Sequence, residues 1–218
     1  MKKIIYILMG ILIFMTFSFA SAQEELLNSA NTLKEIFRIH KIPTKILLKS
    51  KAIVVVPSAT KIGFFIGGEF GGGVASIRRG DGSWSNPFFI KLKSGSFGWQ
   101  FGYEQNSILL IFNSKNSVNS LLSSSTTIGV DATASAGPLA KTYEKNSKLN
   151  FSAEIYTYRE SEGLFLGVSL KGGVITQDLD KDVEYYGNGI KASDIINMPI
   201  KKDTYAIKEY FNAINVIR

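Results

Sequence analysis

The chain has 218 residues, of which 45% are hydrophobic, 20% are charged and 12% are aromatic, and its net charge is +7. This is the composition of a folded globular protein, so disordered and collagen-like chains are excluded. Cysteine is absent and His40 is the only histidine, which excludes disulfides, thiolate sites and histidine-rich metal sites. Most enzyme chemistries are therefore disfavoured, and we expect no catalytic residue, metal or cofactor.

The first 22 residues have the features of an export signal. Two lysines precede an apolar stretch over residues 4–19, which ends in the small residues Ala-Ser-Ala at 20–22. Small side chains at the third and first positions before a bond favour cleavage after Ala22, with Gln23 as the new N-terminus. The alternative is an uncleaved membrane anchor, but the stretch is short for about 30 Å of hydrocarbon. We expect residues 1–22 to be removed and the mature protein to be periplasmic or secreted, and membrane-associated.

The start of the mature chain predicts two helices and a strand. Apolar residues at helical spacing predict an amphipathic helix over Glu24–Arg38. Pro43 suits the first turn of a second, short helix that runs through Ser50, because its missing N–H is not needed there. The apolar run Ala52–Pro57 then predicts a buried strand.

From position 62 to about 170 the pattern predicts mainly strands. The alternation over 128–136 predicts one strand, and two more, around 151–155 and 164–170, are joined through a turn at 160–163. A further strand is predicted to carry four aromatic residues on one inward face, namely Phe97, Trp99, Phe101 and Tyr103.

Two helices and an acidic loop complete the predicted elements. Ser114 is expected to cap a short helix, and Thr204 or Asp203 to cap a final one. That last helix should bury a stripe made of Ile207, Tyr210, Phe211 and Ile214.

Between those helices, acidic residues alternate over 178–184, as in calcium loops. An EF-hand needs glycine at its sixth position and glutamate at its twelfth. Here the sixth position is Val183 and the twelfth is Gly189. A solvated acidic loop is the favoured interpretation, and a weak calcium site remains open.

Glycine is concentrated in the predicted strands, above all in Gly67–Gly73. Glycine weakens a strand unless the backbone bulges, bends or approaches another segment closely, so this run favours a strongly curled sheet. No phosphate-binding glycine motif opens a helix. We predict a single α+β domain over 23–218, with a largely antiparallel, barrel-like sheet and helices at its N- and C-termini.

A basic segment covers residues 34–51. It holds six basic residues against the single acid Glu35, and an amphipathic helix with a basic flank is typical of peripheral membrane proteins. The alternative is a solvated face on two ordinary helices. Nucleic-acid binding is disfavoured, because the aromatic residues are not interleaved with the basic ones. The predicted lipid-binding residues are Lys34, Arg38, Lys41, Lys45, Lys49 and Lys51.

Several segments together resemble the SYLF domain, also called the Ysc84 or DUF500 family, in its bacterial, exported form. The likeness covers nearly all of the mature chain and is most specific over 71–173. The segments that carry it are Gly71–Val74 before Arg78-Arg79, Trp84–Ile90, Gly95–Gly102, Ile128–Ala132, Ala136–Pro138, Tyr156–Tyr158 and Gly163–Leu170.

The resemblance implies a non-enzymatic lipid-binding module of the phospholipid or phosphoinositide type. Some eukaryotic members also bind actin. The expected partner is an anionic phospholipid membrane surface. The alternative function is a structural or interaction protein of the cell envelope, which would bind an anionic polymer or a protein partner.

Overall fold

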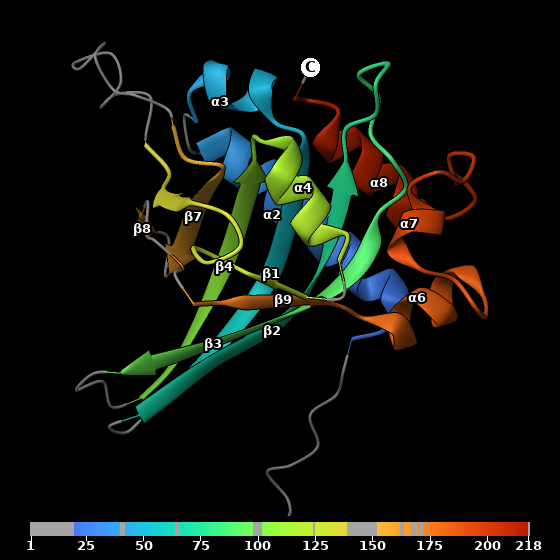
Figure 1. The fold of residues 1–218 in the computed structure, drawn as a ribbon. Coiled ribbons are helices and arrows are strands. Elements are labelled where there is room, and N and C mark those ends of the chain that lie inside the picture. Colours follow the sequence, from blue (N-terminus) through green and yellow to red (C-terminus); the bar gives the residue numbers. More distant parts are fainter. Residues whose placement is uncertain are drawn as a thin grey trace, which may run out of the picture.

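The computed structural model describes residues 20–39, 42–63, 66–97, 102–123, 125–138, 152–161, 164–166, 170 and 172–217. These residues form an α+β fold around one nine-stranded sheet (Figure 1). The strand order is β5-β9-β3-β2-β1-β4-β7-β6, and β8 pairs with β7 beside this path. All pairs are antiparallel except β6 with β7. The predicted curled, largely antiparallel sheet is confirmed, as a half-barrel whose described strands follow an open path.

The helices are α2 (Ala22–Ile39), α3 (Thr44–Lys49), α4 (Lys115–Leu121), α6 (Leu179–Tyr186), α7 (Ala192–Ile195) and α8 (Tyr205–Ile214). The strands are β1 (Ala52–Gly63), β2 (Ile66–Ile77), β3 (Phe88–Phe97), β4 (Gly102–Phe112), β5 (Ser125–Thr127), β6 (Ala134–Ala136), β7 (Ile155–Ser161), β8 (Leu164–Leu166) and β9 (Val174–Gln177). In this part of the chain, no helix is long and apolar enough to cross a membrane.

Strand β1 lies at the centre of the sheet, between β2 and β4. Its first residues, 52–56, are fully buried, as expected for a strand covered on both faces. Successive side chains alternate between the faces, so that Val55 packs toward α2 and α8 while Val54 packs toward α4 and α7. The predicted buried strand is therefore confirmed, and it forms the middle layer between helices on both sides (Figure 1).

The glycines of β2 allow it to approach an irregular part of β1. The register of β1 shifts with β2 between Val55 and Thr60, the part of the strand that contains Pro57. A Cβ atom at Gly73 would lie 2.0 Å from the backbone oxygen of Val55, and one at Gly71 would lie 2.8 Å from that of Ser58. Only glycine fits at these distances, which explains Gly71 and Gly73 where β2 lies against the irregular part of β1.

The predicted helices near the start and the end of the described chain are confirmed. Helix α2 covers the predicted range, and α3 follows Pro43. The hydroxyl of Ser114 accepts a hydrogen bond from the N–H of Ser117 and caps α4. Thr204 caps α8, whose predicted apolar stripe is buried.

Two predicted strands are wrong in their extent. Positions 97–103 do not form one strand, because β3 ends at Phe97 and β4, which runs in the opposite direction, begins at Gly102. The predicted inward packing of Trp99 with its aromatic neighbours lies outside the described residues. The range 128–136 is interrupted by a turn, in which Gly129 has a φ of 82° and Val130 is exposed.

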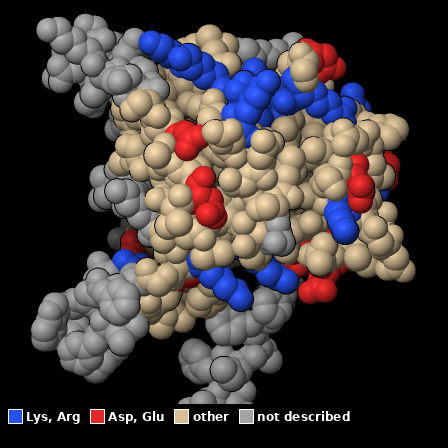
Figure 2. All heavy atoms as spheres, in the orientation of Figure 1, with Lys and Arg blue, Asp and Glu red and all other residues tan. Residues whose placement is uncertain are grey.

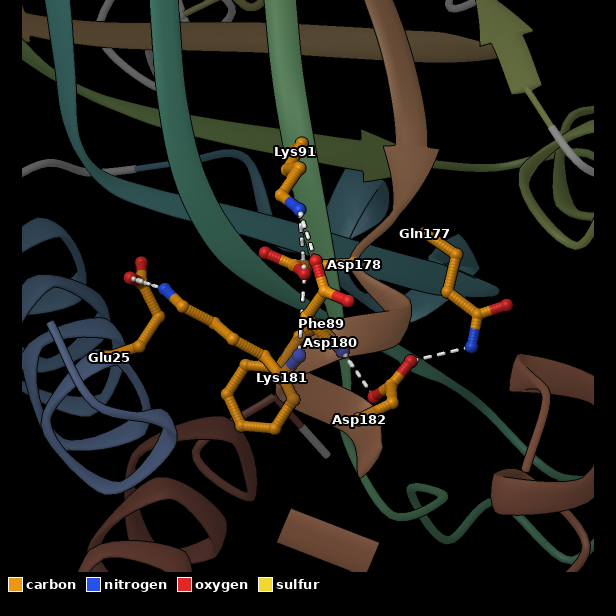
Figure 3. A network of polar contacts seen from close by, with 8 residues as sticks. All are labelled: Glu25, Phe89, Lys91, Gln177, Asp178, Asp180, Lys181 and Asp182. Atoms are coloured by element: carbon orange, nitrogen blue, oxygen red, sulfur yellow. Dashed lines mark hydrogen bonds and ion pairs between the residues drawn. The ribbon is translucent and has the colours of Figure 1, made fainter. Parts of the chain in front are cut away.

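The predicted solvated loop at 178–184 is also wrong, because these residues start helix α6. Asp178 is buried and caps the helix by accepting a hydrogen bond from the N–H of Lys181. Asp182 is fully buried, and it accepts from the N–H of Phe89 at 2.9 Å and from the amide of Gln177 at 2.5 Å. Figure 3 shows these contacts, which fix α6 to the sheet. Alternating acids therefore serve as a cap and an internal acceptor here.

Candidate functional site

Three segments that are far apart in the sequence meet at one end of the central strands. Ala52, the first residue of β1, pairs with Ile77 at the end of β2 and with Phe112 at the end of β4. Just before it, the N–H of Lys51 donates to the carbonyl of Phe112, and its own carbonyl accepts from the N–H of Arg78, both at 2.7 Å. Residues directly before β1 and directly after β2 and β4 are therefore neighbours in space.

These segments enclose a hollow of about 790 Å³, which we call the basic hollow. Among the described residues, five basic side chains line it, and no aspartate or glutamate does. Figure 2 shows Lys and Arg atoms gathered along this end of the molecule, where α3 lies. The lining residues are Leu48, Lys49, Ser50, Lys51, Ile77, Arg78, Arg79, Gly80, Asn113, Lys115, Val118 and Asn119.

Arg78 forms one side of the basic hollow and is fixed by neutral acceptors. One of its terminal nitrogens donates to the carbonyl of Ile217 at 2.9 Å and to the hydroxyl of Ser50 at 3.2 Å. Its guanidinium lies 4.6 Å from the centre of the Trp84 ring, a cation–π distance. Burial lowers the pKa of Arg78 from its ordinary value, although an arginine stays charged in proteins.

Arg79 is held in the same way. Its Nη2 donates to the carbonyl oxygens of Ile196 and Met198, at 2.8 and 2.7 Å. Carbonyl acceptors orient a guanidinium without cancelling its charge. The carboxylate of Asp81 interacts electrostatically with Arg79, but among the described residues no carboxylate forms a close ion pair with Arg78 or Arg79, so both guanidinium groups can contribute charge to an anion in the hollow.

An apolar side chain stands beside these cations. Leu48, on α3, is 55% exposed, whereas Ile46 on the same short helix is buried in the core. A leucine exposed next to Lys49 has the arrangement of an interfacial segment, in which cations meet headgroups and an apolar side chain enters the acyl boundary.

A second, neighbouring hollow of about 670 Å³ shares Arg78 with the basic hollow. Lys202 and Lys208 also line it, together with one acid, Asp81. The hydroxyl of Ser83 donates to the carboxylate of Asp81 at 2.7 Å, and this bond lowers the pKa of Asp81. This second hollow therefore has the same sign of charge but a less uniform lining.

The structure brings only some of the predicted lipid-binding residues together. Lys49 and Lys51 line the basic hollow. Lys34 instead pairs with Glu209 of α8, while Arg38 and Lys45 are exposed on α2 and α3 without lining the hollow. Lys41 and His40 lie outside the described residues.

The sequence interpretation missed Lys115, and it did not count Arg78 and Arg79 among the predicted lipid-binding residues. No spacing marks Lys115, since it is a single cation at the start of a polar helix. Only the pairing of β1 with both β2 and β4 brings it near the others.

The chemistry of the basic hollow is that of anion binding. Its lining offers ammonium and guanidinium donors, and the described residues of that lining include no carboxylate, histidine or cysteine. Charge-assisted hydrogen bonds from such donors bind phosphate and carboxylate oxygens. Within the described ranges, no three acidic, histidine or cysteine side chains form a group that could hold a metal ion.

Sequence comparison finds a family model and related proteins. Residues 93–216, more than half of the chain, match the Ysc84 family, described as "Las17-binding protein actin regulator". The chain is 32% identical over 156 residues to the SH3 domain-containing YSC84-like protein 1 of Rattus norvegicus, covering 71% of this chain and 46% of that protein. It is 31% identical over 163 residues to the LAS seventeen-binding protein 3 of Saccharomyces cerevisiae, covering 73% of this chain and 35% of that protein.

The chain thus spans less than half the length of these two relatives. Within the matched residues, Asn113, Lys115, Val118 and Asn119 line the basic hollow, and Lys202 and Lys208 line the second hollow beside it. The resemblance drawn from the sequence motifs is confirmed, and the chain belongs to the Ysc84 family, the family of the SYLF domain.

Proposed function

We propose that this chain is a non-enzymatic module that binds peripherally to anionic phospholipid, with a lipid phosphate held in the basic hollow. The observation that carries the proposal is the lining of that hollow, whose described residues include five cations and no acid. The exposed Leu48 beside it supplies an apolar contact. Membership of the Ysc84 family is consistent with a binding role.

The expected binding free energy suits reversible attachment to a membrane. Each Lys or Arg near an anionic surface contributes about 1 kcal/mol, and a buried leucine side chain contributes about 2 kcal/mol. Together these terms reach about 7 kcal/mol, which corresponds to a dissociation constant of order 10 μM. Such a protein would leave the membrane as salt rises, because surface charges are screened.

We also propose that the protein acts outside the cytoplasm, at the periplasmic or outer membrane face. The support is the N-terminal pattern of two lysines, an apolar stretch and small residues at 20–22. A peripheral binder on that face would meet phospholipid headgroups directly after export.

A second candidate function is binding to an anionic polymer or a protein partner of the envelope. It is favoured by the names of the relatives, one of which is called a Las17-binding protein. An acidic segment of such a partner would meet the same cations. The two candidate functions differ in whether the protein binds to a lipid surface that carries no other protein or polymer.

Vesicle co-sedimentation with two matched double variants tests the lipid proposal. Lys49→Glu with Lys115→Glu reverses two exposed cations of the basic hollow, and Lys93→Glu with Lys191→Glu reverses two exposed cations elsewhere. The first pair should lower binding to phosphatidylglycerol vesicles at least tenfold, and the second should lower it much less. Equal losses would show that only net charge matters. Failure of the wild type to bind any vesicle would favour the envelope partner.

A further inference from the structure

The first residues of α2 belong to the fold. The hydroxyl of Ser21 accepts a hydrogen bond from the N–H of Glu24 at 3.2 Å, and its carbonyl accepts from the N–H of Glu25 at 2.9 Å. Ser21 is therefore the N-cap of the helix, and the spacing from Ser21 to Glu24 is that of a capping box. Without this serine, the first N–H groups of α2 would lose their acceptor.

Ala22 is part of the same docked turn. Its side chain is 1% exposed and lies in the core that contains Leu26. Its N–H donates at 3.0 Å to a carboxylate oxygen of Glu184, which lies on α6. The residue thus fills a position in the core and ties the start of α2 to a helix 162 residues further along the chain.

The next contact along α2 reinforces this arrangement. Glu25 pairs with Lys181 of α6 at 2.6 Å, and both side chains are largely buried (Figure 3). The contact of Ala22 with Glu184 therefore stands one helical turn before a buried ion pair between the same two helices. Removal of Ser21 and Ala22 would take away the cap, a core methyl group and one of these two links.

The sequence offers two bonds that suit signal cleavage. Ala20 and Ala22 are small residues before the bond after Ala22, and Ser18 and Ala20 occupy the same relative positions before the bond after Ala20. We infer that the signal peptidase cuts after Ala20, so that the mature chain begins at Ser21 and keeps the complete first turn of α2. This inference rests on the export that we propose above.

The reaction is a peptide-bond hydrolysis. Water adds a hydroxyl group to the carbonyl carbon of Ala20 as the bond to Ser21 breaks, and the nitrogen of Ser21 takes up the proton. The signal segment leaves with a carboxylate at Ala20, and Ser21 becomes the N-terminal residue of the folded protein.

The intact mass of the exported protein tests this inference. The full chain, expressed with its own N-terminus in a bacterium and recovered from the envelope fraction, should have the mass of residues 21–218. A mass of residues 23–218 would overturn the inference while leaving export intact. A mass that retains residues 1–20 would instead overturn the export on which the inference rests.

The variant Ala22→Leu distinguishes cleavage after Ala20 from cleavage after Ala22, because the mass of the product identifies the cut bond whether or not the product folds. Leucine is a poor residue directly before the cut, so cleavage after Ala22 would stop in this variant. Cleavage after Ala20 should continue, because position 22 then lies beyond the bond. The expected product is again residues 21–218, one alanine-to-leucine mass difference heavier. Accumulation of the uncleaved variant, with normal processing of the wild type, would contradict a cut after Ala20.

Discussion

Lys181 and Glu25 form an ion pair in a largely dry place, with side chains 12% and 8% exposed. Their charges compensate each other, and Glu25 also lies against Gly72, where a Cβ atom would be 3.0 Å from its carboxylate. The pair is thus a structural link between α2 and α6. A buried charge that loses its partner is costly, whereas replacing both charges is often tolerated.

This predicts a non-additive pair of variants. Lys181→Met should destabilise the protein by about 3–5 kcal/mol, because the carboxylate of Glu25 would stay buried without its partner. The double variant with Glu25→Gln should recover a large part of that loss. Urea unfolding of the wild type, both single variants and the double variant measures the coupling. A double variant as unstable as the sum of the single ones would show that the pair contributes nothing specific.

Asp182 makes the stability of the protein depend on pH. Burial, the largest cause, raises the pKa of this carboxyl from 3.8 to about 6, although hydrogen bonds from Gln177 and Phe89 oppose the shift. A carboxyl with a raised pKa stabilises the fold fully below its unfolded pKa. This contribution is lost as pH rises through the folded pKa, here between about pH 4 and pH 6.

The variant Asp182→Asn should remove this pH-dependent contribution to stability, because its amide oxygen still accepts from the N–H of Phe89 but the amide does not titrate. Between pH 4 and pH 7, the stability of the wild type should fall relative to the variant by up to about 3 kcal/mol, since one pKa unit corresponds to about 1.4 kcal/mol. Unfolding free energies of both proteins at the two pH values measure the difference. If wild type and variant differed in unfolding free energy by the same amount at pH 4 and pH 7, the raised pKa of Asp182 would be refuted.

At the scale of elements, the glycines of β2 are the feature with the sharpest steric consequence. Gly73 faces the backbone of Val55 at a distance that no side chain tolerates, whereas Gly80, just beyond the strand, has open space around its Cβ position. These two glycines therefore form a matched pair for substitution.

Gly73→Ala should destabilise the protein by about 3 kcal/mol or more, because the added methyl group forces β2 away from β1. For a domain of this size that corresponds to a fall of about 6–12 °C in melting temperature. Gly80→Ala should change stability by less than about 0.5 kcal/mol. Thermal melts of the two variants decide the matter, and equal effects would contradict close packing of β2 on β1.

The elements also show which patterns predict structure. Helical spacing and cap residues predicted α2, α4 and α8, because these signals are local. The alternation of large and small side chains wrongly predicted single strands over 97–103 and 128–136. The same alternation also occurs where the chain reverses between two strands or turns at a glycine. The acids at 178–184 were misread because a cap and a buried acceptor have the composition of a surface loop.

At the scale of the molecule, the order of predicted helices and strands and the glycine run predicted the fold class, and local charge predicted only part of the site. Lys49 and Lys51 were found because they lie in a basic segment. Lys115 joins them only through the order of the strands, which no local pattern reveals. The hollow is thus a product of topology, made where one strand begins and two others end.

Binding of the wild-type protein to vesicles, followed as salt is raised, tests the central claim most directly. Vesicles of phosphatidylcholine with phosphatidylglycerol should bind the protein at low ionic strength. They should release most of it by about 0.5 M salt, because the Debye length falls from about 10 Å at 0.1 M to about 3 Å at 1 M. Vesicles of phosphatidylcholine alone should bind little throughout. Equal binding to both vesicles, or binding that does not respond to salt, would contradict an anionic lipid held by the basic hollow.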